Sequence, residues 1–179
     1  TLNHALADGG TLLVRDGAVQ SYVALTVASL DVEDATTSIV FNEAVATAGA
    51  VSVSGDAVVT LDAPLSSAGA DIAIGGASVA QNADITTSGS GTVTVAASSG
   101  SITMADGTVT TADSGSVSYS AGMDVALSAL NSSNGTVSVT AGAGYSTAGA
   151  ITDNLSADGS NVVTAGLLTL SAVTGIGSV

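Results

Sequence analysis

The chain has 179 residues, of which 22 are glycine and 2% are aromatic, and its formal net charge is -14, with Lys+Arg 1 against Asp+Glu 15. So few large rings exclude a core built on aromatic packing, and the negative charge disfavours nucleic acid or an anionic membrane surface as a partner. Because the chain contains no cysteine, a disulfide framework, a thiolate metal site and a cysteine nucleophile are also excluded.

Residues 1–48 carry the least regular pattern of the chain. No glycine occurs over 18–48, so this segment is either a set of less regular coils or the edge of a different module. Apolar and polar residues alternate over 22–27 and 39–41, which favours strands, and a short helix over 41–48 is the alternative. Two Asp-Gly pairs in this segment, Asp8-Gly9 and Asp16-Gly17, predict turns.

Residues 49–159 repeat one pattern, as GAVSVSGDAVVTLDAPLSSA and later GSVSYSAGMDVALSALNSSN show. Gly49 and Gly69 lie 20 residues apart, whereas the step from Gly135 to Gly159 is 24 residues. A fixed period of this size is typical of a repeat architecture, in which each unit buries its apolar face only by stacking on its neighbours.

Each repeat contains short bursts of apolar residues at alternate positions, which is the periodicity of strands with one inward and one outward face. The first burst is followed by a second and by a shorter third. The first is Val51 and Val53, Ile72 and Ile74, Val93 and Val95, Val117 and Tyr119, or Val137 and Val139. The second is Val59 and Leu61, Ile102 and Met104, or Val125 and Leu127, and the third has Leu65, Ile85, Val109, Leu130 or Ile151.

Three strands for every 20 to 24 residues predict a coil that turns three corners and returns one layer higher. The expected fold is therefore all-β, a parallel β-helix of seven to eight coils that forms a rod about 35 Å long at the usual strand spacing. We expect 1–179 to be a single solenoid segment excised from a longer repeat protein, with 160–179 forming a further coil that continues beyond the fragment. Disorder is the alternative for so acidic a chain, but the alternating apolar residues argue against it.

The two repeat units quoted above resemble the degenerate repeats of filamentous-haemagglutinin-like exoproteins and giant bacterial adhesins, whose loose form is G-x-V-x-V-x-A-x-G-x-V-x-L. The match covers roughly 49–159. This resemblance implies a right-handed β-helix, secretion to the bacterial cell surface, and a role as a stalk or an adhesive filament. No segment matches the secretion domain of such proteins, so the secretion route stays open.

Few residues are candidates for chemistry. Asp31, Glu33 and Asp34 offer the hard oxygen ligands that suit Ca²⁺, but they lack the order of an EF-hand loop. A solvated acidic corner is the expected interpretation of this cluster, and any Ca²⁺ binding is expected to be weak and to follow from the net charge. No other cofactor is expected.

Enzymatic activity is not expected. Polysaccharide-cleaving β-helix enzymes need a basic residue near the scissile bond, and His4 and Arg15 are the only basic candidates. We interpret His4 as a solvated terminal residue, and Arg15 as half of a local surface ion pair beside Asp16 in a turn.

The sequence thus predicts a structural stalk or adhesive filament segment, with a glycan- or peptide-binding module or an extracellular fibre subunit as alternatives. Tyr22, Tyr119 and Tyr145 do not share one repeat position, which argues against an aromatic glycan groove. Expected partners are neighbouring repeats of the parent protein, cell-surface molecules or glycans, and further copies bound end to end. Membrane insertion is not expected, because the uncharged stretch 125–152 has a period of two. An ice-binding lattice is disfavoured by the mixed outward residues, which are Ser52, Ala73, Thr94, Ser118 and Ser138.

Overall fold

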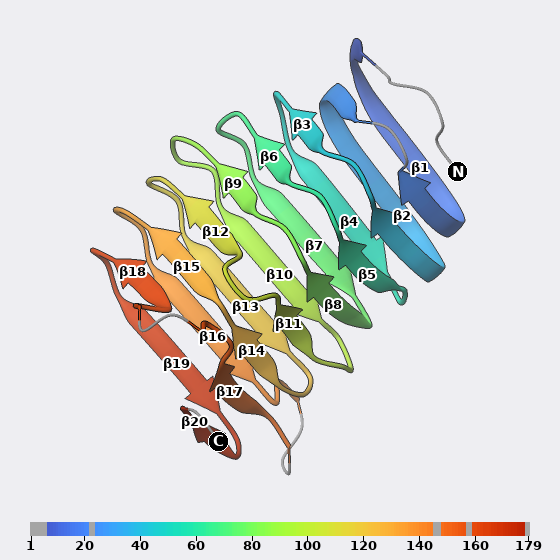
Figure 1. Ribbon diagram of the computed structural model, residues 1–179. Coiled ribbons are helices and arrows are strands. Elements are labelled where there is room, and N and C mark those ends of the chain that lie inside the picture. Colours follow the sequence, from blue (N-terminus) through green and yellow to red (C-terminus); the bar gives the residue numbers. More distant parts are fainter. Residues whose placement is uncertain (1–6, 22–23, 145–147, 157–158, 178–179) are drawn as a thin grey trace.

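The chain folds as a parallel β-helix of about seven turns. The computed structural model describes residues 7–21, 24–144, 148–156 and 159–177, and its strands lie one above another from β1 to β20 (Figure 1). The described residues contain no helix, and therefore none that could cross a membrane. The all-β stacked coil predicted from the repeats is confirmed, and its right-handedness stays a prediction.

Three faces run along the axis, and each regular coil contributes one strand to each face. Face 1 contains β4 (Val51–Gly55), β7 (Ile72–Gly76), β10 (Val93–Ala97), β13 (Val117–Ala121), β16 (Val137–Ala141) and β19 (Leu168–Ala172). Face 2 contains β5 (Val58–Leu61), β8 (Ser78–Gln81), β11 (Ile102–Met104), β14 (Val125–Leu127), β17 (Ala150–Asp153) and β20 (Gly175–Ile176). Face 3 contains β3 (Val45–Thr47), β6 (Leu65–Ser67), β9 (Ile85–Thr87), β12 (Val109–Ala112), β15 (Ala129–Ser132) and β18 (Val162–Thr164).

The first two strands are long because they bend through the corners of the coil without a break. β1 (Ala7–Ser21) pairs only with β2 (Leu25–Phe41) among the described strands, in a parallel ladder with two register shifts. β2 then pairs with β3, β4 and β5, which is one strand of each face. The segment before the regular repeats therefore stacks on the same axis as the rest (Figure 1).

The described residues up to 48 form strands that pass through corners. The Asp-Gly pairs at 8–9 and 16–17 lie beside the two register shifts of β1, opposite the points where β2 passes from face 3 to face 1 and from face 1 to face 2. They therefore lie at corners of the coil as predicted, although β1 continues through both corners as one strand. No helix forms over 41–48, where β2 ends and β3 (Val45–Thr47) follows. The strand predicted over 39–41 is confirmed.

Ranks of small apolar side chains fill the interior, where a rank is one position repeated in successive coils. The strand pairings of face 1 place these residues directly above one another. The first rank is Leu30, Val51, Ile72, Val93, Val117 and Val137, and the second is Val32, Val53, Ile74, Val95, Tyr119 and Val139. Every one of these residues is at most 2% exposed, so the alternation predicted for the first burst is confirmed.

The third burst was predicted less well. Leu65, Ile85 and Leu130 are buried on face 3 as expected. However, the inward residue of β12 is Thr110 and not its more apolar neighbour Val109, since Thr110 pairs in register with Ile85. Ile151 lies on face 2 in β17, because the coil that follows Gly135 is longer than expected.

Glycines stack at the corner between faces 3 and 1. A Cβ atom on Gly115 would overlap the carbonyl oxygen of Gly91, and one on Gly135 would overlap that of Gly115. The backbone of each coil therefore lies directly against the next at this corner, which only glycine permits. The next member of the stack is Gly166, whose Cβ would meet Gly135. The spacing of the repeats predicted Gly159 at this position, and that prediction was wrong. The coil is longer than expected, because the chain makes additional loops before and after β17.

Hydroxyl groups bond the same corner from the end of face 3. Each is inside the coil and donates to the carbonyl oxygen of the corner residue one coil earlier. The pairs are Ser67 to Gly49 (2.9 Å), Thr87 to Ala70 (2.7 Å), Ser132 to Gly115 (2.7 Å) and Thr164 to Gly135 (2.7 Å). Ala112 occupies this rank between Thr87 and Ser132 and leaves a gap in it.

Candidate functional site

The acidic residues Asp31, Glu33 and Asp34 lie on β2. Asp34 has a φ of 56°, which is the left-handed region and turns the chain between faces 1 and 2. Glu33 already accepts a hydrogen bond from Arg15. Among the described residues, no group of three or more His, Cys, Asp or Glu side chains is arranged to hold a metal ion. Weak Ca²⁺ binding by the acidic surface as a whole stays a prediction.

Arg15 pairs with Glu33 across neighbouring strands. Its Nε donates to Glu33 Oε2 at 2.7 Å, and the two residues are register partners in β1 and β2. The side chains are 62% and 35% exposed, so the pair contributes at most about 1 kcal/mol. The surface ion pair was expected, but with Asp16 in a turn. The contact was missed because its partner lies 18 residues away and is brought near only by the stacking of coils.

Aspartates at the corners tie one coil to the next. In each case a side-chain oxygen accepts a backbone N–H at the start of the equivalent strand in the following coil or from the residue just before it. The pairs are Asp71 with Thr92 (2.8 Å), Asp84 with Val109 (2.8 Å) and Asp124 with Ala150 (2.8 Å). These carboxylates therefore serve the fold by satisfying corner N–H groups that have no strand partner.

Hydrogen bonds of this kind favour the charged form of two carboxylates, Asp71 and Asp106. The backbone N–H of Thr92, and then its hydroxyl at 2.9 Å, lower the pKa of Asp71 below the ordinary value of 3.8. The hydroxyl of Ser156, followed by its backbone N–H, lowers the pKa of Asp106 in the same way. A lowered pKa does not suit Asp71 or Asp106 to act as a general acid, because an acid catalyst needs a raised pKa.

The outer surface of face 1 carries no charged residue from β4 to β19. The described acidic residues from Glu43 onward lie at corners, except Asp153 at the end of β17. Two outward ranks of small residues cover the face. One is Ser52, Ala73, Thr94, Ser118, Ser138 and Thr169, and the other is Ser54, Gly75, Ala96, Ser120, Thr140 and Ser171. The mixed composition expected of the first rank is confirmed, and this face has no aromatic platform for a sugar.

The loop after β17 folds back over two earlier coils. Asn154 Nδ2 donates to the carbonyl oxygen of Met104 at 2.6 Å, and the backbone N–H of Ser156 donates to Asp106 Oδ1 at 2.9 Å. These contacts span 50 residues of sequence and fasten β11 to β17 on the outside of the rod. A polar hollow lies under the loop between Asp106 and Asp153, but both carboxylates are already engaged as acceptors.

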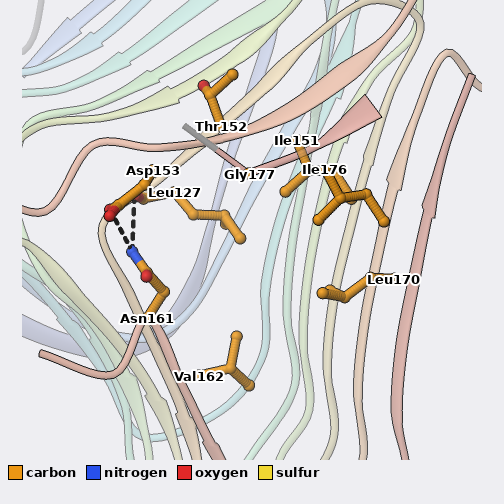
Figure 2. Close-up of a pocket in the computed structure, with 9 residues that line it drawn as sticks. All are labelled: Leu127, Ile151, Thr152, Asp153, Asn161, Val162, Leu170, Ile176 and Gly177. Carbon is orange, nitrogen blue, oxygen red and sulfur yellow. Dashed lines mark hydrogen bonds between the residues drawn. The ribbon is translucent and has the colours of Figure 1, made fainter. Parts of the chain in front are cut away.

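An apolar hollow of about 120 Å³ lies at the last coil. Figure 2 shows Leu127, Ile151, Val162, Leu170 and Ile176 around it, with Asn161 bonded to Asp153 at one side. In the inner coils this space is filled by the coil above. Ile176 lines the hollow, and it is one of five exposed apolar residues near the end of the chain, namely Leu167 (69%), Ile176 (55%), Val163 (52%), Val173 (44%) and Leu168 (43%).

Three residues considered in the sequence lie outside the described residues. They are His4, Tyr22 and Tyr145. Tyr119 lies inside the core and therefore offers no stacking surface to a ligand.

Comparisons with known proteins give no relative. No family model matches the chain, and neither a curated protein nor a solved structure matches it.

Proposed function

We propose that the chain is a segment of a rigid stalk or adhesive filament in a large secreted bacterial surface protein, of the kind that its repeats resemble. In this proposal the chain is extracellular, and its partners are the neighbouring repeats of the parent protein and the molecules of another cell surface. One observation carries the proposal, which is the unbroken stack of core ranks from β2 to β17 along a single axis. Such a stack lengthens by adding coils, each buried by its neighbours.

A catalytic role is not part of this proposal. The corner carboxylates accept backbone N–H groups, and the one cation of the described residues, Arg15, is bound to Glu33. The apolar hollow is lined mainly by core residues at an open end and holds no arrangement of nucleophile and base.

The stalk role is tested by changing the number of coils. Duplication of residues 93–116, one coil, is expected to lengthen the rod by about 4.8 Å without loss of cooperative unfolding. The maximum dimension from small-angle X-ray scattering measures this change. A duplicated segment that loops out, leaving the length unchanged, would contradict the proposal.

Adhesion is tested separately with the chain immobilised on beads. A pure stalk is expected to bind neither cells nor a glycan array. An adhesive filament is expected to bind saturably through face 1, and Ser118→Glu with Ser138→Glu should then abolish the binding. Thr103→Glu, on the outer surface of face 2, is the matched control.

The exposed apolar side chains of the last coil favour a second candidate for these 179 residues, the end-to-end association of copies into a fibre. Leu12 and Val14 of β1 belong to the same two ranks as Leu168 and Leu170 of β19, so a second copy stacked on the last coil would continue both ranks. The chain of these 179 residues, with a mass of 16.8 kDa, is expected to show a mass that rises with concentration in sedimentation. A constant monomer mass would contradict this candidate.

Cross-linking defines the geometry of such a fibre. Leu13 and Thr169 share an outward rank, so a mixture of Leu13→Cys and Thr169→Cys chains should form disulfide dimers on oxidation. Dimers formed by Thr169→Cys alone would show tail-to-tail contact instead.

A further inference from the structure

Three polar side chains meet inside the core of three successive coils. Gln81 ends β8, Thr110 lies in β12 and Tyr119 lies in β13, and all three are 0% exposed. Each one interrupts a rank of apolar residues. Gln81 stands between Leu61 and Met104, Thr110 between Ile85 and Leu130, and Tyr119 between Val95 and Val139.

The three side chains form a closed ring of hydrogen bonds. The Tyr119 hydroxyl donates to Gln81 Oε1 at 2.6 Å, and Gln81 Nε2 donates to Thr110 Oγ1 at 2.9 Å. Because the single phenolic proton is used for Gln81, the 2.7 Å contact between Thr110 and Tyr119 is donated by the threonine. Each member therefore donates once and accepts once within the ring.

Burial keeps the ring in this state. It raises the pKa of the Tyr119 hydroxyl above the ordinary value of 10.0, so this hydroxyl stays a hydrogen-bond donor to Gln81 even in alkaline solution. None of the ring atoms is among the buried side-chain atoms of the described residues that lack a partner. The ring is thus satisfied only while the three coils stack in their present order.

The apolar ranks alone specify that order poorly. Valine and isoleucine recur at the same position in coil after coil, so a coil stacked on the wrong neighbour still buries similar side chains. Buried polar residues can supply the missing specificity, because a wrong alignment leaves them unpaired in a low-dielectric interior.

We infer that the ring of Gln81, Thr110 and Tyr119 fixes which coil stacks on which in the middle of the solenoid. A misfolded form in which β13 stacks on β7, with the coil of β10 looped out, separates Gln81 from Thr110 and leaves buried donors and acceptors unpaired. This inference rests on the geometry of the core and is independent of the proposed role as a stalk.

Disulfide trapping can report the stacking order, since the chain has no cysteine of its own. Thr94 and Ser118 are outward register partners on β10 and β13, so a Thr94→Cys/Ser118→Cys pair reports the native order. Ala73 lies one strand further, on β7. An Ala73→Cys/Ser118→Cys pair is about 9.6 Å apart in the native order, too far for a disulfide, and reports the order that skips a coil.

Both pairs are compared after refolding under oxidising conditions. In the wild-type ring we expect the native pair to close and the skipping pair to stay reduced. In a triple variant, Gln81→Leu/Thr110→Val/Tyr119→Phe, we expect the skipping pair to close about tenfold more often, which corresponds to the cost of one unpaired buried group. A matched control, Leu61→Met/Val95→Ile/Leu130→Ile, changes the same three ranks without touching the ring and should behave as the wild type.

A stability measurement separates this role from simple packing. Tyr119→Phe alone removes the hydroxyl that is bonded to Gln81 Oε1 and to Thr110 Oγ1. The urea midpoint of this variant should therefore fall below that of the wild type. The triple variant removes all three polar groups and should recover the midpoint while losing the unique order. Equal closure of the skipping pair in the wild type, in Tyr119→Phe and in the triple variant would overturn the inference.

Discussion

The middle coils and the last coil have the same sequence pattern but differ in burial. On face 1, Val137 is 0% exposed, whereas its register partner in the last coil, Leu168, is 43% exposed. On face 2, Ile151 is 3% exposed and its partner Ile176 is 55% exposed. Burial in this fold is therefore supplied by the coil above, and the apolar alternation of a strand alone does not provide it.

Hydrogen bonding differs between the two regions in the same way. Strand β13 pairs with β10 on one side and β16 on the other, whereas β19 pairs only with β16 among the described strands. Amide exchange is therefore expected to be slowest in the middle coils and to become faster toward β20.

The largest effect is expected at the glycine corner. Gly115→Ala forces a methyl group into the backbone of Gly91, and we expect the free energy of unfolding to fall by about 4 kcal/mol. Gly166→Ala makes a similar overlap with Gly135, but the last coil can move outward, so less than half of that loss is expected. Urea unfolding measures both.

The control for this comparison is Gly107→Ala. Gly107 has a φ of 78° and no atom within 4 Å of a Cβ, so only backbone strain of about 1 kcal/mol is expected. Equal losses for Gly115→Ala and Gly166→Ala would show that the last coil is as constrained as the middle.

A core truncation should give the next largest difference. Ile102→Ala removes a fully buried side chain on face 2 and is expected to cost about 3 kcal/mol. Ile176→Ala removes a side chain of the same rank that is 55% exposed, and less than about 1 kcal/mol is expected. Thermal and urea unfolding of the two variants measure these losses in the free energy of unfolding. Similar losses for both variants would contradict the conclusion that neighbouring coils supply the burial.

A smaller effect of opposite sign is expected at Ala112. Ala112→Ser places a hydroxyl in the one gap of the rank that bonds the glycine corner, where it can donate to the carbonyl oxygen of Gly91. We expect a gain of about 1 kcal/mol, and Ser132→Ala should lose a similar amount. A urea midpoint that falls for Ala112→Ser would show that the corner lacks room for the hydroxyl.

The smallest effect concerns pH. The folded-state pKa of Asp71 lies below the ordinary 3.8, so its carboxylate stabilises the fold above that value. This stabilisation is lost as the pH falls through the lower folded-state pKa. The difference in urea midpoint between the wild type and Asp71→Asn should therefore be present at pH 7 and shrink below pH 3.8. A difference that grows on acidification would contradict this assignment.

Much of the fold could be predicted from the sequence, because the strands of two of the three faces carry valine or isoleucine at alternate positions. Thr110 was missed because Val109 beside it is the more apolar residue, and only the buried ring explains why a threonine faces inward. Gln81 was also missed, because only the buried ring explains why a glutamine lies inside the core. Two further contacts depend on the length of a coil, namely the pairing of Arg15 with Glu33 and the stacking of Gly166 on Gly135. A repeat of variable period does not specify that length.

The corner aspartates also have a consequence for how the rod behaves in salt. Eight strand layers span about 34 Å, so a formal charge of -14 amounts to one charge in every 2 to 3 Å of length. Duplex DNA carries one charge per about 1.7 Å and gathers a condensed layer of cations. A protein rod of nearly this linear charge density should hold such a layer too, and the affinity of any basic partner should then decline steeply as ionic strength rises.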